Sequence, residues 1–126
     1  MLTNVPVHPT LPAVDLERAK KFYEEKLGLK VTRTDPSPGA LLQAGEGTQL
    51  YIYQRSATKA DHTAASFTVA DVEAIVKGLK AKGVVFEEVA LPNMGVKTVD
   101  GVATMGEMKA AWFKDTEGNI LAITNM

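Results

Sequence analysis

The sequence predicts an α+β fold made of two consecutive β-α-β-β-β modules. Two amphipathic helical segments follow Asp15 and Asp71, which lie 56 residues apart. Each helical segment is preceded by one extended segment and followed by three shorter ones. The last strand region of the first module, Glu46–Gln54, aligns with Glu117–Asn125 at an offset of 71 residues. This repeat of one element order indicates two related modules within one chain.

The first module is expected at about residues 4–55. Its first strand, Val5–Val14, holds three prolines, which remove ladder donors and favour a sheet edge. Asp15 is a suitable N-cap, and Gly28 is the expected helix stop. The apolar residues between them recur at helical spacing: Leu16, Ala19, Phe22, Tyr23 and Leu27. Three further strands are predicted at Leu29–Thr34, Ala40–Ala44 and Gln49–Gln54.

The second module is expected at about residues 62–126. Its helix begins after Asp71, ends at Gly83 and has an apolar face formed by Val72, Ile75, Val76 and Leu79. Its strands are predicted at His62–Val69, Val84–Val89, Lys109–Lys114 and Asn119–Thr124. The repeat offset grows from 56 to 71 residues along the module, which requires an insertion. We expect this insertion within Leu91–Glu107, as a long glycine-containing loop acting as a flexible wall or lid.

Composition narrows the classes of protein and partner. The chain has 126 residues, of which 45% are hydrophobic and 23% charged, as in a globular domain. It has no cysteine and two histidines, which excludes a disulfide scaffold and argues against an imidazole-based metal site. A net charge of −1 argues against a nucleic-acid partner. No apolar run reaches membrane-spanning length and no secretory signal is evident, so we expect a cytoplasmic protein without a membrane partner.

Two sequence motifs accompany this order of elements. The first is the helix Asp15-Leu16-Glu17-Arg18-Ala19 leading to Phe22-Tyr23 and Leu27-Gly28. The second is the closing hairpin Phe113-Lys114-Asp115-Thr116-Glu117-Gly118-Asn119. Together they resemble the vicinal oxygen chelate superfamily, which includes glyoxalase I, extradiol dioxygenases, and fosfomycin and bleomycin resistance proteins. The resemblance covers nearly the whole chain and implies one domain over residues 1–126 with a glyoxalase/bleomycin resistance-like fold. Because this fold hosts many chemistries, it does not specify the activity.

The resemblance also implies where a metal would bind. Metal-binding members place one ligand in the first and the last strand of each module, positions held here by His8, Tyr51, Ala64 and Ala122. Alanine cannot ligate through its side chain, and a neutral tyrosine is a poor ligand for a divalent ion. We therefore expect no metal and no cofactor. His62, two residues before Ala64, is either a second imidazole for such a site or an exposed histidine on a polar linker.

Strand alternation predicts which side chains face away from the helices. Tyr51 would share this inner face with Gln49 and Tyr53, while Leu50 and Ile52 would face the helix. Small residues and hydroxyls would line the corresponding face of the second module, namely Ala64, Ser66, Thr68, Ile120, Ala122 and Thr124. These side chains either line an open pocket or fill the sheet interior. One of Trp112 and Phe113 would face the same side.

These observations favour a metal-free protein that binds a flat, apolar organic ligand. The candidate ligand-binding residues are His8, Gln49, Tyr51, Tyr53, Ser66 and Trp112. One alternative is a glyoxalase-like lyase or isomerase, with an atypical metal site or with His8 as the catalytic base. Another is a structural or interaction module with a closed sheet interior. Since exposed concave faces need a partner, and since members of the resembled family often pair, we also expect a homodimer.

Overall fold

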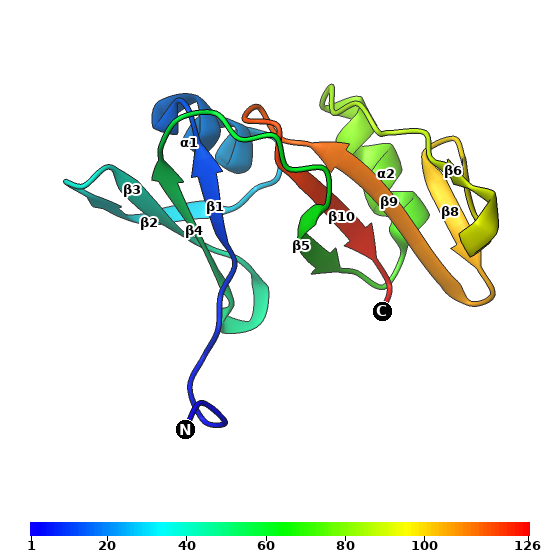
Figure 1. The fold of residues 1–126 in the computed structure, drawn as a ribbon, viewed down its shortest axis with the longest axis horizontal. Helices are drawn as coiled ribbons and strands as arrows, with labels where there is room; N and C mark the ends of the chain where they lie inside the picture. The colour runs from blue at the N-terminus through cyan, green and yellow to red at the C-terminus, as the bar shows by residue number, and fades with distance from the viewer. The chain divides into compact units, whose positions relative to one another are not determined.

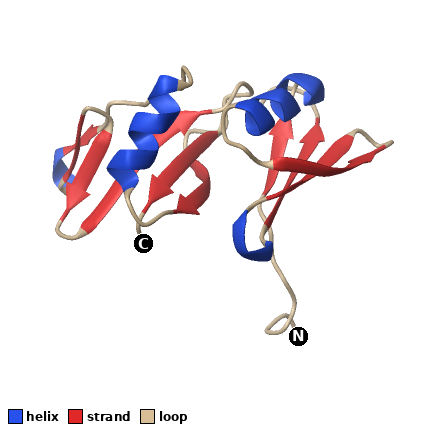
Figure 2. Cartoon of the chain, turned by 180° about the vertical axis from the view of Figure 1, so that it is seen from behind, coloured by secondary structure: helices blue, strands red, loops and turns tan.

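The computed structural model describes residues 1–126 and divides into two compact units, residues 1–58 and 59–126. Each unit has one β-sheet with one α-helix packed on one face (Figures 1 and 2). The predicted α+β class with two related modules is therefore confirmed. Neither helix has the length and apolar character needed to cross a membrane.

The first unit has a four-stranded sheet in the order β1-β4-β3-β2. Its strands are β1 (Thr10–Ala13), β2 (Lys30–Asp35), β3 (Gly39–Gln43) and β4 (Gln49–Gln54). Strand β1 runs parallel to β4 and lies at the sheet edge, as its prolines predicted. It is shorter than the predicted Val5–Val14, because pairing begins only where the backbone N–H of Tyr51 donates to the carbonyl oxygen of Pro9 at 3.0 Å. A short 3-10 turn, η1 (Gly45–Gly47), joins β3 to β4.

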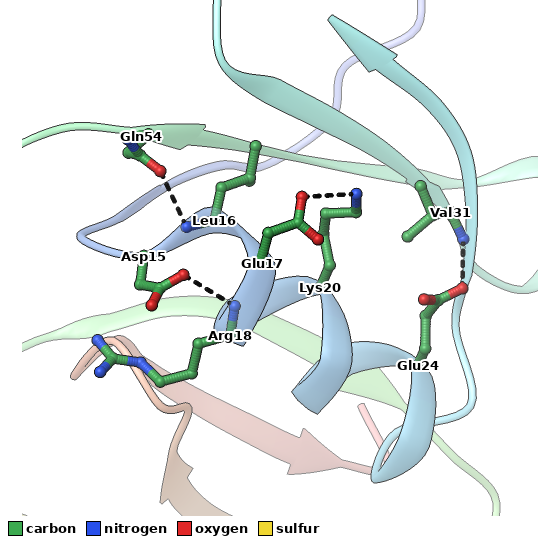
Figure 3. A network of polar contacts seen from close by, with 8 residues as sticks. All are labelled: Asp15, Leu16, Glu17, Arg18, Lys20, Glu24, Val31 and Gln54. Carbon is green, nitrogen blue, oxygen red and sulfur yellow. Dashed lines mark hydrogen bonds and ion pairs between the residues drawn. The ribbon is translucent and has the colours of Figure 1, made fainter.

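Helix α1 (Leu16–Glu25) begins at the predicted N-cap. The Oδ1 atom of Asp15 accepts a hydrogen bond from the backbone N–H of Arg18 at 3.1 Å (Figure 3). The Oε1 atom of Gln54 accepts from the backbone N–H of Leu16, also at 3.1 Å, which ties the start of the helix to the end of β4. The other polar contacts in Figure 3 join Glu17 to Lys20 and Glu24 to the backbone of Val31.

The core of the first unit lies between α1 and one face of the sheet. The buried side chains are Leu11, Ala13, Leu16, Ala19, Tyr23, Ala40, Leu42, Leu50 and Ile52. Full burial of a large apolar side chain stabilises a fold by about 1.5–3 kcal/mol. Alternation along β4 is as predicted, since Leu50 and Ile52 are buried while Tyr51 and Tyr53 are partly exposed. One face of this sheet is therefore covered by the helix and the other is not.

The second unit has a six-stranded sheet in the order β5-β10-β9-β8-β7-β6. Helix α2 (Val72–Ala81) begins after the predicted cap, where Oδ1 of Asp71 accepts from the backbone N–H of Ala74 at 3.0 Å. Strands β5 and β10 are parallel, and β8, β9 and β10 form an antiparallel series. The strands are β5 (Thr63–Thr68), β6 (Ala90–Leu91), β7 (Val96–Val99), β8 (Val102–Met105), β9 (Met108–Lys114) and β10 (Ile120–Thr124), with a 3-10 turn η2 (Pro92–Met94).

The insertion of the second module differs from the expectation. The strand predicted at Val84–Val89 is reduced to one bridge between Phe86 and Phe113. The predicted loop at Leu91–Glu107 is largely sheet, because β7 and β8 pair as a hairpin that extends β9. Its turn, Asp100-Gly101, has positive φ at both residues (53° and 85°), which is the type I′ geometry that matches strand twist. Main-chain pairing thus holds most of the segment that was expected to be a flexible lid.

The core of the second unit resolves the orientation of the two adjacent aromatic residues. Phe113 is fully buried and packs against Phe86 with ring centroids 5.3 Å apart. Trp112 lies on the opposite face of β9, directly across from Ala122 on β10. Ile75, which was expected on the buried helix face, is 39% exposed. The other buried apolar side chains are Val72, Val76, Val84, Ala103, Ala110, Ala111, Leu121, Ala122 and Ile123.

Candidate functional site

The candidate site lies on the face of the first sheet that α1 does not cover. Directly paired residues of neighbouring strands point to the same side of a sheet. Two rows of side chains therefore cross this face. One row contains Thr10, Tyr51, Leu41 and Arg33, and the next contains Pro12, Tyr53, Gly39 and Asp35.

Three polar side chains from two of these strands form a connected cluster. The guanidinium of Arg33 donates two hydrogen bonds to the carboxylate of Asp35, from Nε to Oδ1 at 2.8 Å and from Nη2 to Oδ2 at 3.2 Å. The hydroxyl of Tyr51 donates to Oδ2 of the same carboxylate at 2.8 Å. The Asp35 side chain is 25% exposed and that of Arg33 is 58% exposed. The cluster is therefore held by three hydrogen bonds and is partly exposed to solvent.

The hydrogen bonds of this cluster set its protonation state. The Arg33 guanidinium and then the Tyr51 hydroxyl lower the pKa of the Asp35 carboxyl below its ordinary value. The same carboxylate raises the pKa of Tyr51, because the hydroxyl donates a hydrogen bond that the phenolate would lose. At neutral pH the site thus presents a carboxylate, a protonated phenol and a guanidinium. Arg33 uses two of its five N–H donors on Asp35, so the other N–H groups are available to an acceptor on a ligand.

A glycine permits this arrangement. Gly39 lies in β3 between Asp35 of β2 and Tyr53 of β4. A Cβ atom at this position would overlap the hydroxyl and the ring of Tyr51. The Tyr51 ring therefore lies across the strand at Gly39, and the missing side chain lets its hydroxyl reach the carboxylate two strands away.

The structure distributes the other predicted residues of the first unit around this cluster. Tyr53 and Gln49 lie on the same face of β4 as Tyr51, where Tyr53 is partly exposed and Gln49 is exposed. His8 is exposed and precedes β1, two residues before Thr10. Arg33 and Asp35 were not among the predicted site residues. The predicted strand ended at Thr34, whereas β2 extends to Asp35, and the spacing of two residues within β2 places both side chains on one face.

The uncovered face of the second sheet carries the remaining candidates. Ser66, Ala122 and Trp112 form one row across β5, β10 and β9. Ser66 is exposed, Trp112 is partly exposed and Ala122 is buried. His62 lies before β5 and is exposed, with its Nδ1 atom 3.3 Å from the carbonyl oxygen of Thr63. Trp112 is thus the one large aromatic ring of this row.

The side chains do not fit a divalent metal. Among residues 1–126, no three or more His, Asp or Glu side chains are grouped so that they could hold an ion. In the first unit, the carboxylate of Asp35 is already paired with the Arg33 guanidinium, and the Tyr51 hydroxyl donates to it rather than offering a phenolate. In the second unit, the corresponding positions are Ala64 and Ala122, whose methyl groups have no donor atom.

Comparison with known proteins identifies one family. The model of the Glyoxalase/Bleomycin resistance protein/Dioxygenase superfamily matches residues 6–123. No curated protein shows significant sequence similarity to the chain.

Solved structures with the same fold cover nearly the whole chain. A fosfomycin resistance protein, FosX, from Listeria monocytogenes has a TM-score of 0.73 and 16% identity, over 97% of this chain and 91% of that one. A lactoylglutathione lyase from Agrobacterium tumefaciens has a TM-score of 0.69 and 16% identity, over 98% and 95%. A glyoxalase family protein from Enterococcus faecalis has a TM-score of 0.71 and 22% identity, over 98% and 99%. At these identities the likeness establishes the fold alone.

Proposed function

The chain belongs to the Glyoxalase/Bleomycin resistance protein/Dioxygenase superfamily, and we propose that it binds a small organic molecule without a metal. The ligand has a flat apolar body and at least one hydrogen-bond acceptor. The observation that carries this proposal is the cluster of Arg33, Asp35 and Tyr51 on the uncovered face of the first sheet. It combines aromatic surface with a fixed, partly exposed set of polar groups, as organic ligand sites do.

Each part of this face has a role in the proposed complex. The rings of Tyr51 and Tyr53, two residues apart on β4, supply flat apolar contact area. The N–H groups of Arg33 that Asp35 does not use bind the acceptor of the ligand. Asp35 holds Arg33 and Tyr51 in place through its hydrogen bonds to both. Gln49 and His8 offer further polar contacts at the border of the same region.

The second unit contributes its own candidate contacts. Ser66 and Trp112 lie in one row on the uncovered face of the second sheet. We propose that Trp112 stacks on an apolar group of a small-molecule ligand. The Ser66 hydroxyl would hydrogen-bond a polar group of that ligand.

The solved structures with this fold are in keeping with a small-molecule ligand. Their names include a lactoylglutathione lyase and a fosfomycin resistance protein. We infer a binding role for this chain because its side chains do not fit a metal.

We also propose that two copies of the chain associate. Both sheets have a face without a helix, and burial of that surface needs a partner. Light scattering at about 10 μM should give twice the monomer mass of 13.5 kDa, since a specific interface normally holds at this concentration. A mass of one chain would contradict the homodimer without affecting the ligand site of the first sheet.

The proposal is tested first by metal content and ligand screening. Protein purified without added metal should contain far less than one equivalent of nickel, zinc, manganese or iron. A thermal-shift screen of aromatic carboxylates and amides should then yield compounds that raise the melting temperature. One tightly held equivalent of any of these metals would overturn the metal-free assignment.

The two histidines provide a matched pair of variants for the compounds found. His8→Ala should weaken binding, because His8 lies two residues before Thr10, which pairs directly with Tyr51. His62→Ala should leave the affinity unchanged, because His62 is exposed and contacts only the backbone of its neighbour. Equal affinity of both variants and the parent would remove His8 from the site.

A further inference from the structure

A groove in the second unit lies on the opposite side of its sheet from Trp112. Its volume is about 870 Å³. One wall is α2, with Val76, Lys77 and Lys80, and the other is the β7–β8 hairpin, with Lys97, Val99 and Val102. Figure 2 shows α2 on the near side of this sheet, with strands of the hairpin extending past the helix. The groove is therefore formed entirely within residues 59–126.

The inserted hairpin explains why this groove exists. A helix is about 10 Å across, and neighbouring strands are about 4.8 Å apart, so one helix spans about two strand spacings and covers roughly three neighbouring strands. Helix α2 packs on β8, β9 and β10. Strand β7 adds width that this helix does not cover. Val99 of this strand is consequently 67% exposed although it is apolar.

The groove carries more positive than negative charge. Lys77 and Lys97 make no ion pair, and the Nζ atom of Lys80 donates to the backbone carbonyl oxygen of Asp100 at 2.7 Å. Of the two acidic residues in the lining, Glu73 is already paired with Lys109. The lining thus presents three ammonium groups against one carboxylate without a cationic partner.

We propose that this groove binds a small amphipathic anion, with a carboxylate or phosphate against the lysines and a short apolar chain against the valines. The Lys77 and Lys97 ammonium groups come from opposite walls, so an anion between them would be contacted from both sides. Val99, which is 67% exposed, and Val102, which is partly exposed, give an apolar surface whose coverage favours binding. This site is separate from the ligand site proposed on the first sheet and does not depend on it.

An NMR titration tests the groove with defined probes: hexanoate, hexyl phosphate, inorganic phosphate and hexanol. Hexanoate or hexyl phosphate should shift the backbone amide signals of Val99, Val102 and Thr104 in a saturable manner. Hexanol lacks the charge and inorganic phosphate lacks the chain, so both should bind at least about tenfold more weakly. The tighter of the two amphipathic probes identifies the ligand as a carboxylate or a phosphate ester. Inorganic phosphate binding as tightly as hexyl phosphate would overturn the proposal.

Charge-removing variants locate the anion. The double variant Lys77→Gln/Lys97→Gln should bind the tighter of the two amphipathic probes about tenfold or more weakly than the parent. The control Lys21→Gln/Lys30→Gln removes two exposed charges from the first unit and should leave the affinity unchanged. Equal weakening by both double variants would indicate a general charge effect and contradict the site. Tyr51→Ala should not change this affinity, so failure here is distinguishable from failure of the first-sheet site.

Discussion

The two units begin with the same elements and complete their sheets differently. Each has an edge strand parallel to the last strand, followed by an Asp-capped helix. The first unit closes with four strands, and its helix packs on β2, β3 and β4, whereas the second adds the β7–β8 hairpin. The first unit concentrates polar groups on the uncovered face, at Arg33, Asp35 and Tyr51. The second instead gains a lysine-lined groove on its helix side. An insertion in one module has thus provided a binding surface that the other lacks.

The largest expected effect comes from the two adjacent aromatic residues of β9. Phe113→Ala should destabilise the protein by about 3–5 kcal/mol, because it leaves a cavity beside Phe86 in the core of the second unit. Trp112→Ala should reduce the free energy of unfolding much less, because Trp112 is partly exposed on the other face of β9. Chemical denaturation of both variants measures the difference. Equal losses of unfolding free energy would mean that both faces of this strand are packed alike.

A smaller effect is expected at the turn that distinguishes the second unit. Gly101 has φ of 85°, and an added Cβ would lie 3.0 Å from the Cβ of Phe86. Gly101→Ala should therefore destabilise by about 1–3 kcal/mol, through backbone strain and this close contact. Gly45→Ala in η1 of the first unit is the control, because its φ is not positive and a Cβ there meets no atom within 4 Å. It should be near neutral in the same thermal and chemical melts. A neutral Gly101→Ala would show that the type I′ turn does not constrain the hairpin.

The smallest predicted effect is a pH dependence that belongs to the first unit. The pKa of Asp35 is lowered in the folded protein. The contribution of this carboxylate to folding stability is therefore present above the ordinary pKa of 3.8 and is lost as pH falls through the lower folded value. The pKa of Tyr51 is raised, so its contribution is present below 10.0 and is lost as pH rises through the higher folded value. Stability measured at pH 7 and pH 3 should differ less in Asp35→Asn than in the parent. If the stability difference between pH 7 and pH 3 is the same in Asp35→Asn and in the parent, other titratable groups govern the loss of stability at acid pH.

The sequence predicted the outward and inward faces of β4, but not the partners of Tyr51. Strict alternation from Gln49 to Gln54 makes Leu50 and Ile52 buried and the tyrosines accessible. Strand β2 is different, since its register with β3 shifts between Val31 and Arg33. Alternation counted along the sequence does not survive such an irregularity, because one additional residue changes which face the following side chains occupy. The cluster of Arg33 and Asp35 with Tyr51 therefore required the strand pairing.

The inserted hairpin carried a local signal that was outweighed by its glycines. Asp100-Gly101 stands between Val96–Val99 and Val102–Met105, two runs of strand-forming residues. An Asp-Gly pair in this setting favours a two-residue hairpin. Counting Gly95, Gly101 and Gly106 together instead suggested a flexible loop. The position of the Asp100-Gly101 pair between two strand-forming runs was thus more informative than the number of glycines in the segment. The orientation of Trp112 and Phe113 had no local signal and depended on the pairing of β9 with β10.

Calorimetric titration of a ligand into protein that has been dialysed against EDTA tests the central claim most directly. The parent should bind with the same affinity before and after chelation, because the proposed contacts come from Arg33, Tyr51 and Tyr53 rather than from a metal. Tyr51→Ala should weaken binding about 5- to 150-fold, corresponding to about 1–3 kcal/mol of lost aromatic contact, while circular dichroism remains that of the parent. Loss of binding on chelation, or unchanged affinity of Tyr51→Ala, would contradict a metal-free site on the first sheet.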